Sequence, residues 1–173
     1  SKNPASLDFG KLEWLNNQYV QAMGADAFVE ALEPYLKEAG YEDADRDLLK
    51  RAYPLVAERV KLMTEAVPML RYLLDDEVEL DEKILQKDGK KARTALVEGR
   101  KVLAECAWDI ESIEAALREL LVKLDAKPRF VFQPIRVAVC GNQVSPPLFE
   151  SIALLDRDVV DKRLAKAIEV AVD

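Results

Sequence analysis

Apolar side chains recur every three to four positions along most of this chain. This spacing constrains the fold most strongly, because it is the spacing of one face of an α-helix. Four stretches show it in the first half: Leu12, Leu15 and Tyr19; Phe28, Leu32, Tyr35 and Leu36; Leu48, Leu49, Tyr53, Val56 and Val60; and Leu62, Met69, Leu70 and Leu73. In the second half the pattern covers roughly residues 84–106, 110–124 and 159–170. Glycine is sparse, at 6 of 173 residues, so we expect an all-α protein.

Two aspartates mark where the first helices should begin. Asp8 and Asp26 each precede an apolar stretch with helical spacing. The carboxylate of an aspartate accepts hydrogen bonds from the backbone N–H groups that a first helical turn leaves open. We therefore expect both residues to be N-caps, and we expect the second helix to end near Gly40.

One segment competes with the all-α prediction. Residues 130–139 are rich in β-branched and aromatic side chains, and their propensity alone would make them a short buried strand. The sequence has no second run of this kind to pair with it, and an isolated strand leaves its backbone polar groups unsatisfied. A short helix that starts at Pro134 and is closed by Gly141 fits the same residues. We predict the helix.

An acidic run at residues 75–82 separates two helical blocks. Like charges at this density resist packing together, so we expect a solvated connection between two tandem helical subdomains, residues 1–74 and 75–173. On composition alone, an exposed helix–helix loop explains the run equally well. A weaker reading makes the run a site where carboxylates bind a divalent metal ion.

Composition argues against several classes of function. No apolar run approaches the ~20 residues that span a bilayer and no signal peptide precedes the first helix, so a soluble, cytoplasmic protein is expected. Cys106 and Cys140 are isolated in the sequence, and the chain has no histidine. A zinc site or a nucleophile–base pair is therefore not expected, and we predict a non-catalytic chain without a cofactor or metal.

The most distinctive motif lies near the C-terminus, where residues 133–141 read QPIRVAVCG and residues 145–150 read SPPLFE. Arg136 stands among apolar residues, and it should reach a surface that offers an anionic or carbonyl-rich partner. Ser145 before Pro146 predicts an N-cap followed by proline at the first helical position. The N–H groups of such a turn can bind a phosphate or a polar base edge, although most Ser-Pro pairs only begin a helix.

These segments resemble the C-terminal signature of bacterial glutamyl-tRNA synthetases. That family carries Gln/Met-Pro-Leu-Arg-x-Ala-Leu-Thr-Gly, then Ser/Thr-Pro-x-Leu-Phe-Glu, and then an apolar Leu-Leu pair, which is Leu154 and Leu155 here. Residues 9–19, FGKLEWLNNQY, are similar to the family's Phe-x-x-x-Lys-Leu-x-Trp-Met-Asn-x-x-Tyr. Because the two matches stand at opposite ends and in the family's order, the resemblance covers essentially the whole chain.

The resemblance implies an all-helical anticodon-binding region that recognises tRNA(Glu). In the family this region is the C-terminal part of a class I glutamate–tRNA ligase, which binds ATP and magnesium in a separate catalytic domain. The chain has no His-x-Gly-His or Lys-Met-Ser-Lys-Ser type motif, so the resemblance implies only the anticodon-binding part. We expect that part to be a monomer that binds no membrane.

The resemblance also implies which residues read the anticodon. Arg59 takes the position of an arginine that contacts the third anticodon base, and Arg136 is the family's second reader. Ser145, Pro146 and Leu148 line the other two bases, on the helix that follows the Arg136 helix across a single turn. Arginine and serine can bond base edges, while leucine and proline pack on base faces.

Each assignment has a structural alternative. Arg59 is also consistent with a surface residue paired with Glu58 or Glu65, and Pro146 and Leu148 are also consistent with core or turn residues. We expect three residues of the first motif to hold the first helix against its neighbours rather than to touch RNA. They are Trp14, Asn16 and Tyr19.

The net charge of −7 weakens an RNA-binding function, because phosphate contacts normally use a basic surface. Basic residues nevertheless gather in residues 87–101, where only Asp88 and Glu98 oppose them. They are Lys87, Lys90, Lys91, Arg93, Arg100 and Lys101. Docking depends on the charge within about one Debye length, ~8–10 Å, but a solvated helix face explains the cluster equally well. The rival function is a helical protein-interaction or scaffold module that binds no RNA.

Overall fold

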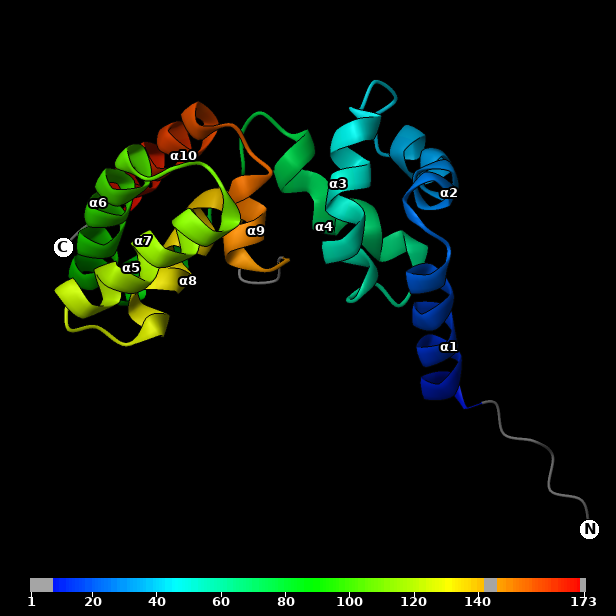
Figure 1. Ribbon diagram of the computed structural model, residues 1–173, viewed down its shortest axis with the longest axis horizontal. Helices are drawn as coiled ribbons and strands as arrows, with labels where there is room; N and C mark the ends of the chain where they lie inside the picture. The colour runs from blue at the N-terminus through cyan, green and yellow to red at the C-terminus, as the bar shows by residue number, and fades with distance from the viewer. Residues whose placement is uncertain (1–7, 142–145, 172–173) are drawn as a thin grey trace, which may run out of the picture. The chain divides into compact units, whose positions relative to one another are not determined.

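The computed structural model describes residues 8–141 and 146–171. Within these residues it contains ten α-helices, one short 3-10 helix and no strand, so the all-α prediction is confirmed (Figure 1). The chain divides into two compact units, Ser1–Leu70 and Arg71–Asp173. The division falls within α4 (Ala66–Leu74), slightly before the expected join at 74/75. The correspondence of these units to functional subdomains 1–74 and 75–173 stays a prediction.

The first unit contains α1 (Phe9–Ala22), α2 (Ala25–Glu38), α3 (Arg46–Ala57) and the 3-10 helix η1 (Met63–Glu65). Asp8 caps α1 as predicted, since its carboxylate accepts a hydrogen bond from the backbone N–H of Lys11 at 3.2 Å. The prediction for Asp26 is wrong, because Gly24 takes the N-cap of α2 at a φ of +82° that glycine adopts freely. Asp26 lies in the first turn instead, 2.7 Å from the ammonium of Lys50.

The core of the first unit lies between α2 and α3. Phe28, Leu32 and Leu49 are fully buried there, and the ring of Phe28 lies 5.1 Å from that of Tyr53. The end of α2 is confirmed near Gly40, which adopts a φ of +86° just beyond the last helical residue.

Helix α1 is attached to the rest of its unit mainly through polar contacts. The side-chain amide of Asn17 donates to the carbonyl oxygens of Ala57 and Val60 at 2.9 and 2.8 Å, beyond the end of α3. Val20 is the buried residue of α1. Trp14 and Tyr19 are 60% and 70% exposed, so the prediction that they pack against neighbouring helices is wrong within the described residues.

The same correction holds for Asn16, which is exposed. Its physical reason is that α1 turns its large apolar side chains away from α3. Those side chains are Phe9, Leu12, Trp14, Leu15 and Tyr19.

The second unit contains six further helices: α5 (Glu82–Lys87), α6 (Gly89–Glu105), α7 (Ile110–Lys123), α8 (Pro128–Cys140), α9 (Leu148–Ala153) and α10 (Arg157–Val170). Helices α6, α8 and α10 pack on one another and enclose Leu96, Ile135 and Leu164 (Figure 1). A Cβ at Gly99 would come within 2.8 Å of the Ile135 side chain, so glycine permits the close approach of α6 and α8. The helix expected over 84–106 is two helices, broken at Asp88.

Helix α8 replaces the competing strand, which confirms that part of the prediction. The expected start at Pro134 is wrong, because Pro128 begins the helix and Pro134 lies inside it. Seven residues of α8 are buried against neighbouring helices, and this packing outweighs the strand propensity of the segment. Gly141 closes the helix as predicted, at a φ of +86°, and its N–H donates to the carbonyl oxygen of Val137 at 2.8 Å.

The acidic run is bonded to the second unit through its backbone, although several of its side chains are exposed, as expected. Arg163 is 5% exposed, and its guanidinium donates to the carbonyl oxygens of Tyr72, Asp75 and Val139 at 2.7 to 2.8 Å. The N–H of Asp81 donates to the carbonyl oxygen of Gly141 at 3.0 Å. The run is therefore held against the C-terminal end of α8.

Candidate nucleic-acid interface

Arg136 lies near the C-terminal end of α8 and is half-buried. Its Nη1 donates to the carbonyl oxygen of Pro146 at 2.7 Å. The arginine therefore meets a carbonyl group, as its apolar surroundings in the sequence require. This bond joins the end of α8 to the segment that leads into α9.

The predicted start of the next helix is wrong. Helix α9 begins at Leu148, with Pro147 as its N-cap, so Pro146 is not the first helical residue. The ring of a proline disfavours the helical conformation in the residue before it, and Pro147 is itself extended, with a ψ of 138°, so the helix begins only after Pro147. Ser145, the predicted N-cap, lies outside the described residues.

The other two predicted contact residues are packed within the second unit. Leu148 is 4% exposed and Pro146 is buried. Next to them, Phe149 is half-buried and its ring makes an edge contact with that of Phe132 at 5.4 Å. The guanidinium of Arg118, from α7, lies 5.6 Å from the Phe149 ring.

Four residues therefore form a continuous surface that we call the Arg136 face: Arg118, Phe132, Arg136 and Phe149. Phe132 and Arg136 lie four residues apart on α8 and so share one side of that helix. The two aromatic rings can stack on planar bases, and the two guanidinium groups can stack on bases and also donate hydrogen bonds to their edges. The sequence pattern missed Arg118, because only the packing of α7 against α9 brings it to this surface.

Arg59 belongs to the first unit and lies just beyond the end of α3. Its side chain is 39% exposed, and its Nη1 lies 3.8 Å from the Glu58 carboxylate and 3.4 Å from the carbonyl oxygen of Leu55. Glu65, the other partner considered for it, instead accepts from the N–H groups of Lys61 and Leu62 at 2.8 and 3.1 Å.

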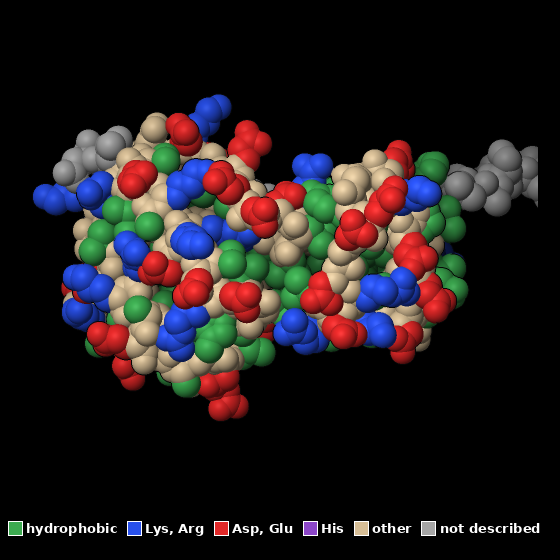
Figure 2. All heavy atoms as spheres, turned by 90° about the horizontal axis from the view of Figure 1, so that it is seen from above, with side chains coloured by type: hydrophobic (Ala, Val, Ile, Leu, Met, Phe, Trp, Pro, Cys, Tyr) green, Lys and Arg blue, Asp and Glu red, His purple; other side chains and the backbone are tan. Residues whose placement is uncertain are grey.

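Half of the basic cluster at residues 87–101 has a structural role. Arg93 donates to the carbonyl oxygen of Ile168 at 2.8 Å, and Arg100 makes a paired contact with Asp161 at 2.6 and 2.8 Å. Lys101 pairs with Glu98 at 2.6 Å. The other half is exposed and makes no ion pair with a carboxylate among the residues that the structure describes: Lys87, Lys90 and Lys91. On the face drawn in Figure 2, acidic and basic side chains are interspersed.

Glu98 joins two helices electrostatically. Hydrogen bonds from Lys101 and Lys123, at 2.6 and 2.7 Å, lower the pKa of Glu98 to about 2.

The pKa of the Cys106 thiol is shifted in the opposite direction, because burial raises it. That shift does not activate the thiol, because a nucleophilic cysteine needs a lowered pKa.

Neither metal binding nor a membrane span is seen in the described part of the chain. Within residues 8–141 and 146–171, no three His, Cys, Asp or Glu residues are grouped so that they could hold a metal ion. The reading of the acidic run as a metal site therefore has no support there. The helices of the same residues include none with the length and apolar character to cross a bilayer.

Comparison with known proteins finds relatives among the glutamate–tRNA ligases. The chain is 40% identical to the ligase of Acidothermus cellulolyticus over 180 residues, which cover 95% of this chain and 35% of that protein. It is 41% identical to the ligase of Saccharopolyspora erythraea over 175 residues, with 95% and 34% covered. The chain therefore spans about a third of the length of these relatives.

The fold is also found in solved structures. A glutamate tRNA ligase from Elizabethkingia meningosepticum superimposes with a TM-score of 0.81 at 22% identity, over 98% of this chain and 34% of that one. This likeness supports the helical architecture. A family model described as the anticodon binding domain matches residues 27–168, which is most of the chain. The chain belongs to the anticodon binding domain family.

Proposed function

We propose that this chain recognises the anticodon of tRNA(Glu) as part of a glutamate–tRNA ligase, which joins glutamate to its tRNA with ATP. Membership of the anticodon binding domain family and the ligase relatives support the partner and the reaction. The observation that carries the proposal to particular residues is the Arg136 face, where two arginines and two aromatic rings adjoin.

The chemistry of this surface suits single-stranded bases that are splayed out of their stack. A base that stacks on an aromatic ring gains about 1–3 kcal/mol, and a guanidinium adds hydrogen bonds to base edges or phosphates. In this proposal Arg136 contacts the bases directly, and the segment with Ser145, Pro146 and Leu148 shapes the surface for the first two bases. Leu148 would contribute through packing rather than direct contact, since it is 4% exposed.

Arg59 is proposed to read the third anticodon base. Its exposed guanidinium is available for this role, because its contact with Glu58 is long and solvated. The side-chain amide of Asn17 donates to the carbonyl oxygens of residues 57 and 60, which stand on either side of Arg59 in the sequence. These bonds fix the backbone from which Arg59 projects.

The remaining two thirds of the whole ligase are proposed to supply catalysis. ATP and magnesium would bind there, while this chain acts as a monomer in the cytoplasm without a cofactor or a membrane. Its contribution is selection and positioning of the tRNA.

Binding of anticodon stem-loops tests the proposal. We expect Arg136→Ala to weaken binding of the stem-loop with a glutamate anticodon by about 1–3 kcal/mol, as loss of a base-edge contact does. Arg71→Ala, an exposed arginine of α4, is the matched control and should have little effect. Absence of any stem-loop binding at low salt would instead support the scaffold function.

Discrimination at the third base tests Arg59 separately. The wild-type chain should bind the glutamate anticodon more tightly than the glutamine anticodon, and Arg59→Gln should reduce that difference. Arg51→Gln removes an exposed arginine from α3 and should preserve it. Equal affinity of the wild type for both stem-loops, unaltered by Arg59→Gln, would contradict the role of Arg59.

A further inference from the structure

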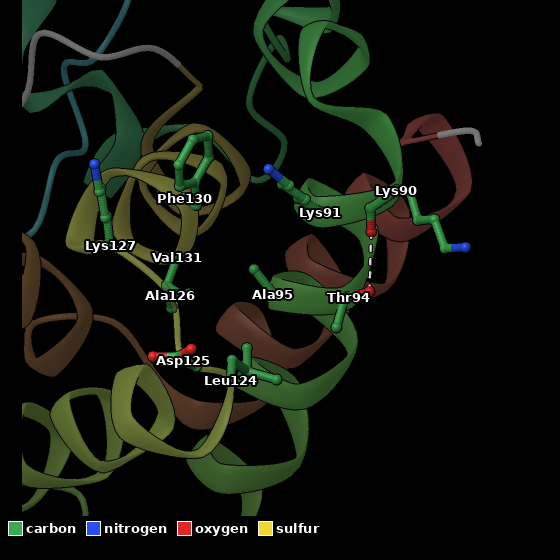
Figure 3. A pocket seen from close by; sticks show the side chains of 10 residues that line it. All are labelled: Lys90, Lys91, Thr94, Ala95, Leu124, Asp125, Ala126, Lys127, Phe130 and Val131. Carbon is green, nitrogen blue, oxygen red and sulfur yellow. Dashed lines mark hydrogen bonds between the residues drawn. The ribbon is translucent and has the colours of Figure 1, made fainter.

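A pocket of about 430 Å³ lies between the start of α6, the loop after α7 and the start of α8 (Figure 3). None of the four residues of the Arg136 face lines this pocket. Its volume falls within the ~300–1,000 Å³ of typical small-molecule sites. The proposed function leaves it without a role.

The floor of the pocket is apolar and its rim is cationic. Ala95, Leu124, Ala126 and Val131 form the floor. At the rim, Lys91 and Lys127 flank the ring of Phe130 in Figure 3, while the side chain of Lys90 points away.

The Phe130 ring is already a platform for cations. The ammonium of Lys91 lies 4.7 Å from the ring centroid, and the guanidinium of Arg129 lies 5.0 Å from it. Phe130 is only half-buried, so part of its surface remains open. Arg129 also lies 3.7 Å from the Asp88 carboxylate, a long pair that leaves most of the positive charge uncompensated.

The acidic group of the pocket lies at its other end. Asp125 stands beside Leu124 in Figure 3, away from Phe130, and adopts a φ of +47°. Its carboxylate is an acceptor for hydroxyl or amino groups, whereas the two lysines are donors for an anion. A ligand that satisfies both ends carries an anionic group, a flat apolar body and a polar hydroxyl.

We propose that this pocket binds one nucleotide, with its base on the apolar floor against Phe130, its phosphate between Lys91 and Lys127, and its sugar hydroxyls toward Asp125. The local excess of positive charge stands out in a chain with a net charge of −7. Such a local patch attracts phosphate even where the whole molecule repels it. The nucleotide comes either from an RNA strand or from a free mononucleotide, which share this chemistry.

Amide chemical shifts of the wild-type chain provide the first test. Adenosine, adenosine monophosphate and a single-stranded hexa-adenylate RNA are titrated separately. We expect the monophosphate or the RNA to shift the amides of Lys91, Thr94 and residues 125–127 and 129–131. Adenosine should bind at least several-fold more weakly because it lacks phosphate. If only the RNA causes shifts, the site binds a nucleotide within an RNA strand. If the RNA and the monophosphate both cause shifts, the site accepts a nucleotide from either source. No shift with any ligand would overturn the proposal.

A pair of double variants provides the second test. Lys91→Gln with Lys127→Gln removes the rim charges, whereas Lys11→Gln with Lys37→Gln removes two exposed lysines of the first unit that make no ion pair among the described residues. The net charge changes equally, from −7 by −2 to −9, so long-range repulsion is matched. The first double variant should lower the affinity for the ligand roughly fivefold or more, and the second should lower it less than about twofold. Equal weakening by both would overturn the proposal.

The two proposals fail separately. Arg136→Ala should leave the amide shifts at residues 125–127 and 129–131 unchanged, because Arg136 does not line the pocket. If the anticodon stem-loops do not bind but the nucleotide shifts persist, the pocket stands and anticodon recognition falls. If the stem-loops bind but no nucleotide shifts appear, the pocket proposal falls and anticodon recognition stands.

Discussion

At the scale of single residues, glycines with left-handed backbones differ in what surrounds them. Gly40 and Gly141 both have a φ of +86° beyond the end of a helix. A Cβ at Gly40 would meet nothing within 4 Å, whereas a Cβ at Gly141 would lie 2.7 Å from the carbonyl oxygen of Glu79. Backbone conformation and close packing can therefore be separated by experiment.

We expect Gly40→Ala to lower the free energy of unfolding by about 1 kcal/mol, which is the conformational part. Gly141→Ala should lower it by roughly 2–4 kcal/mol, because the acidic run must also move away from α8. Urea denaturation followed by circular dichroism measures both. Equal losses would show that the contact with Glu79 has no energetic weight.

At the scale of helices, the Glu98 contacts connect α6 to α7 in a pH-dependent way. The pKa of Glu98 is about 2 in the folded chain against an ordinary value of 4.5. Between these values the unfolded chain binds more protons, so the stabilisation is present above pH 4.5 and disappears as the pH falls toward 2. Glu98→Gln should therefore make unfolding less sensitive to pH in that window.

Acid titration of stability, by urea denaturation at several pH values, measures this effect. Glu119→Gln is the control, since Glu119 is an exposed residue of α7 with no ion pair among the described residues. A pH slope that is the same in Glu98→Gln and in Glu119→Gln would contradict the role of the Lys101–Glu98–Lys123 contacts.

The exposed apolar side of α1 has a spectroscopic consequence. Trp14 is 60% exposed, whereas Trp108 is half-buried and its Nε1 donates to the carbonyl oxygen of Leu155 at 2.7 Å. Iodide should quench the fluorescence of Trp14 several-fold more efficiently than that of Trp108. Trp14→Phe and Trp108→Phe isolate the two signals, and similar quenching in both would mean that α1 is covered in solution.

Sequence patterns predicted the helices and their ends well where neighbouring residues in the sequence determine them. The periodicity identified the helices, the Asp8 carboxylate identified one start, and Gly141 identified one end. Errors arose where the cause lay elsewhere in the chain. Burial of α8 outweighed the apparent start at Pro134, and a second proline delayed α9.

The candidate site shows the same limit. Arg136 was identifiable from the sequence because a single arginine in an apolar run needs a partner. Arg118 was not, since it meets Phe149 only through the packing of α7 on α9. Exposure of Trp14 was also missed, because helical spacing predicts that a face is apolar but not that another element covers it.

At the scale of the whole molecule, a net charge of −7 must be reconciled with the anionic partner that we propose. Arginine contacts to a few phosphates or bases give a salt dependence of about −0.7 in log K per log salt for each single-stranded phosphate neutralised. We expect stem-loop affinity to fall several-fold between about 50 and 200 mM salt. Filter binding at four salt concentrations measures the slope, and an affinity independent of salt would contradict binding through these cations.

The contacts of Arg163 also imply an order of events during synthesis. This residue of α10 bonds carbonyl groups that stand 91, 88 and 24 residues earlier in the chain. Domains generally fold as units, with the N-terminal one first as the chain emerges. The first unit ends at residue 70, whereas the second cannot form the Arg163 contacts until its last helix has left the ribosome. A chain that stops before α10 would therefore keep the Arg59 region but leave the end of α8 without its anchor.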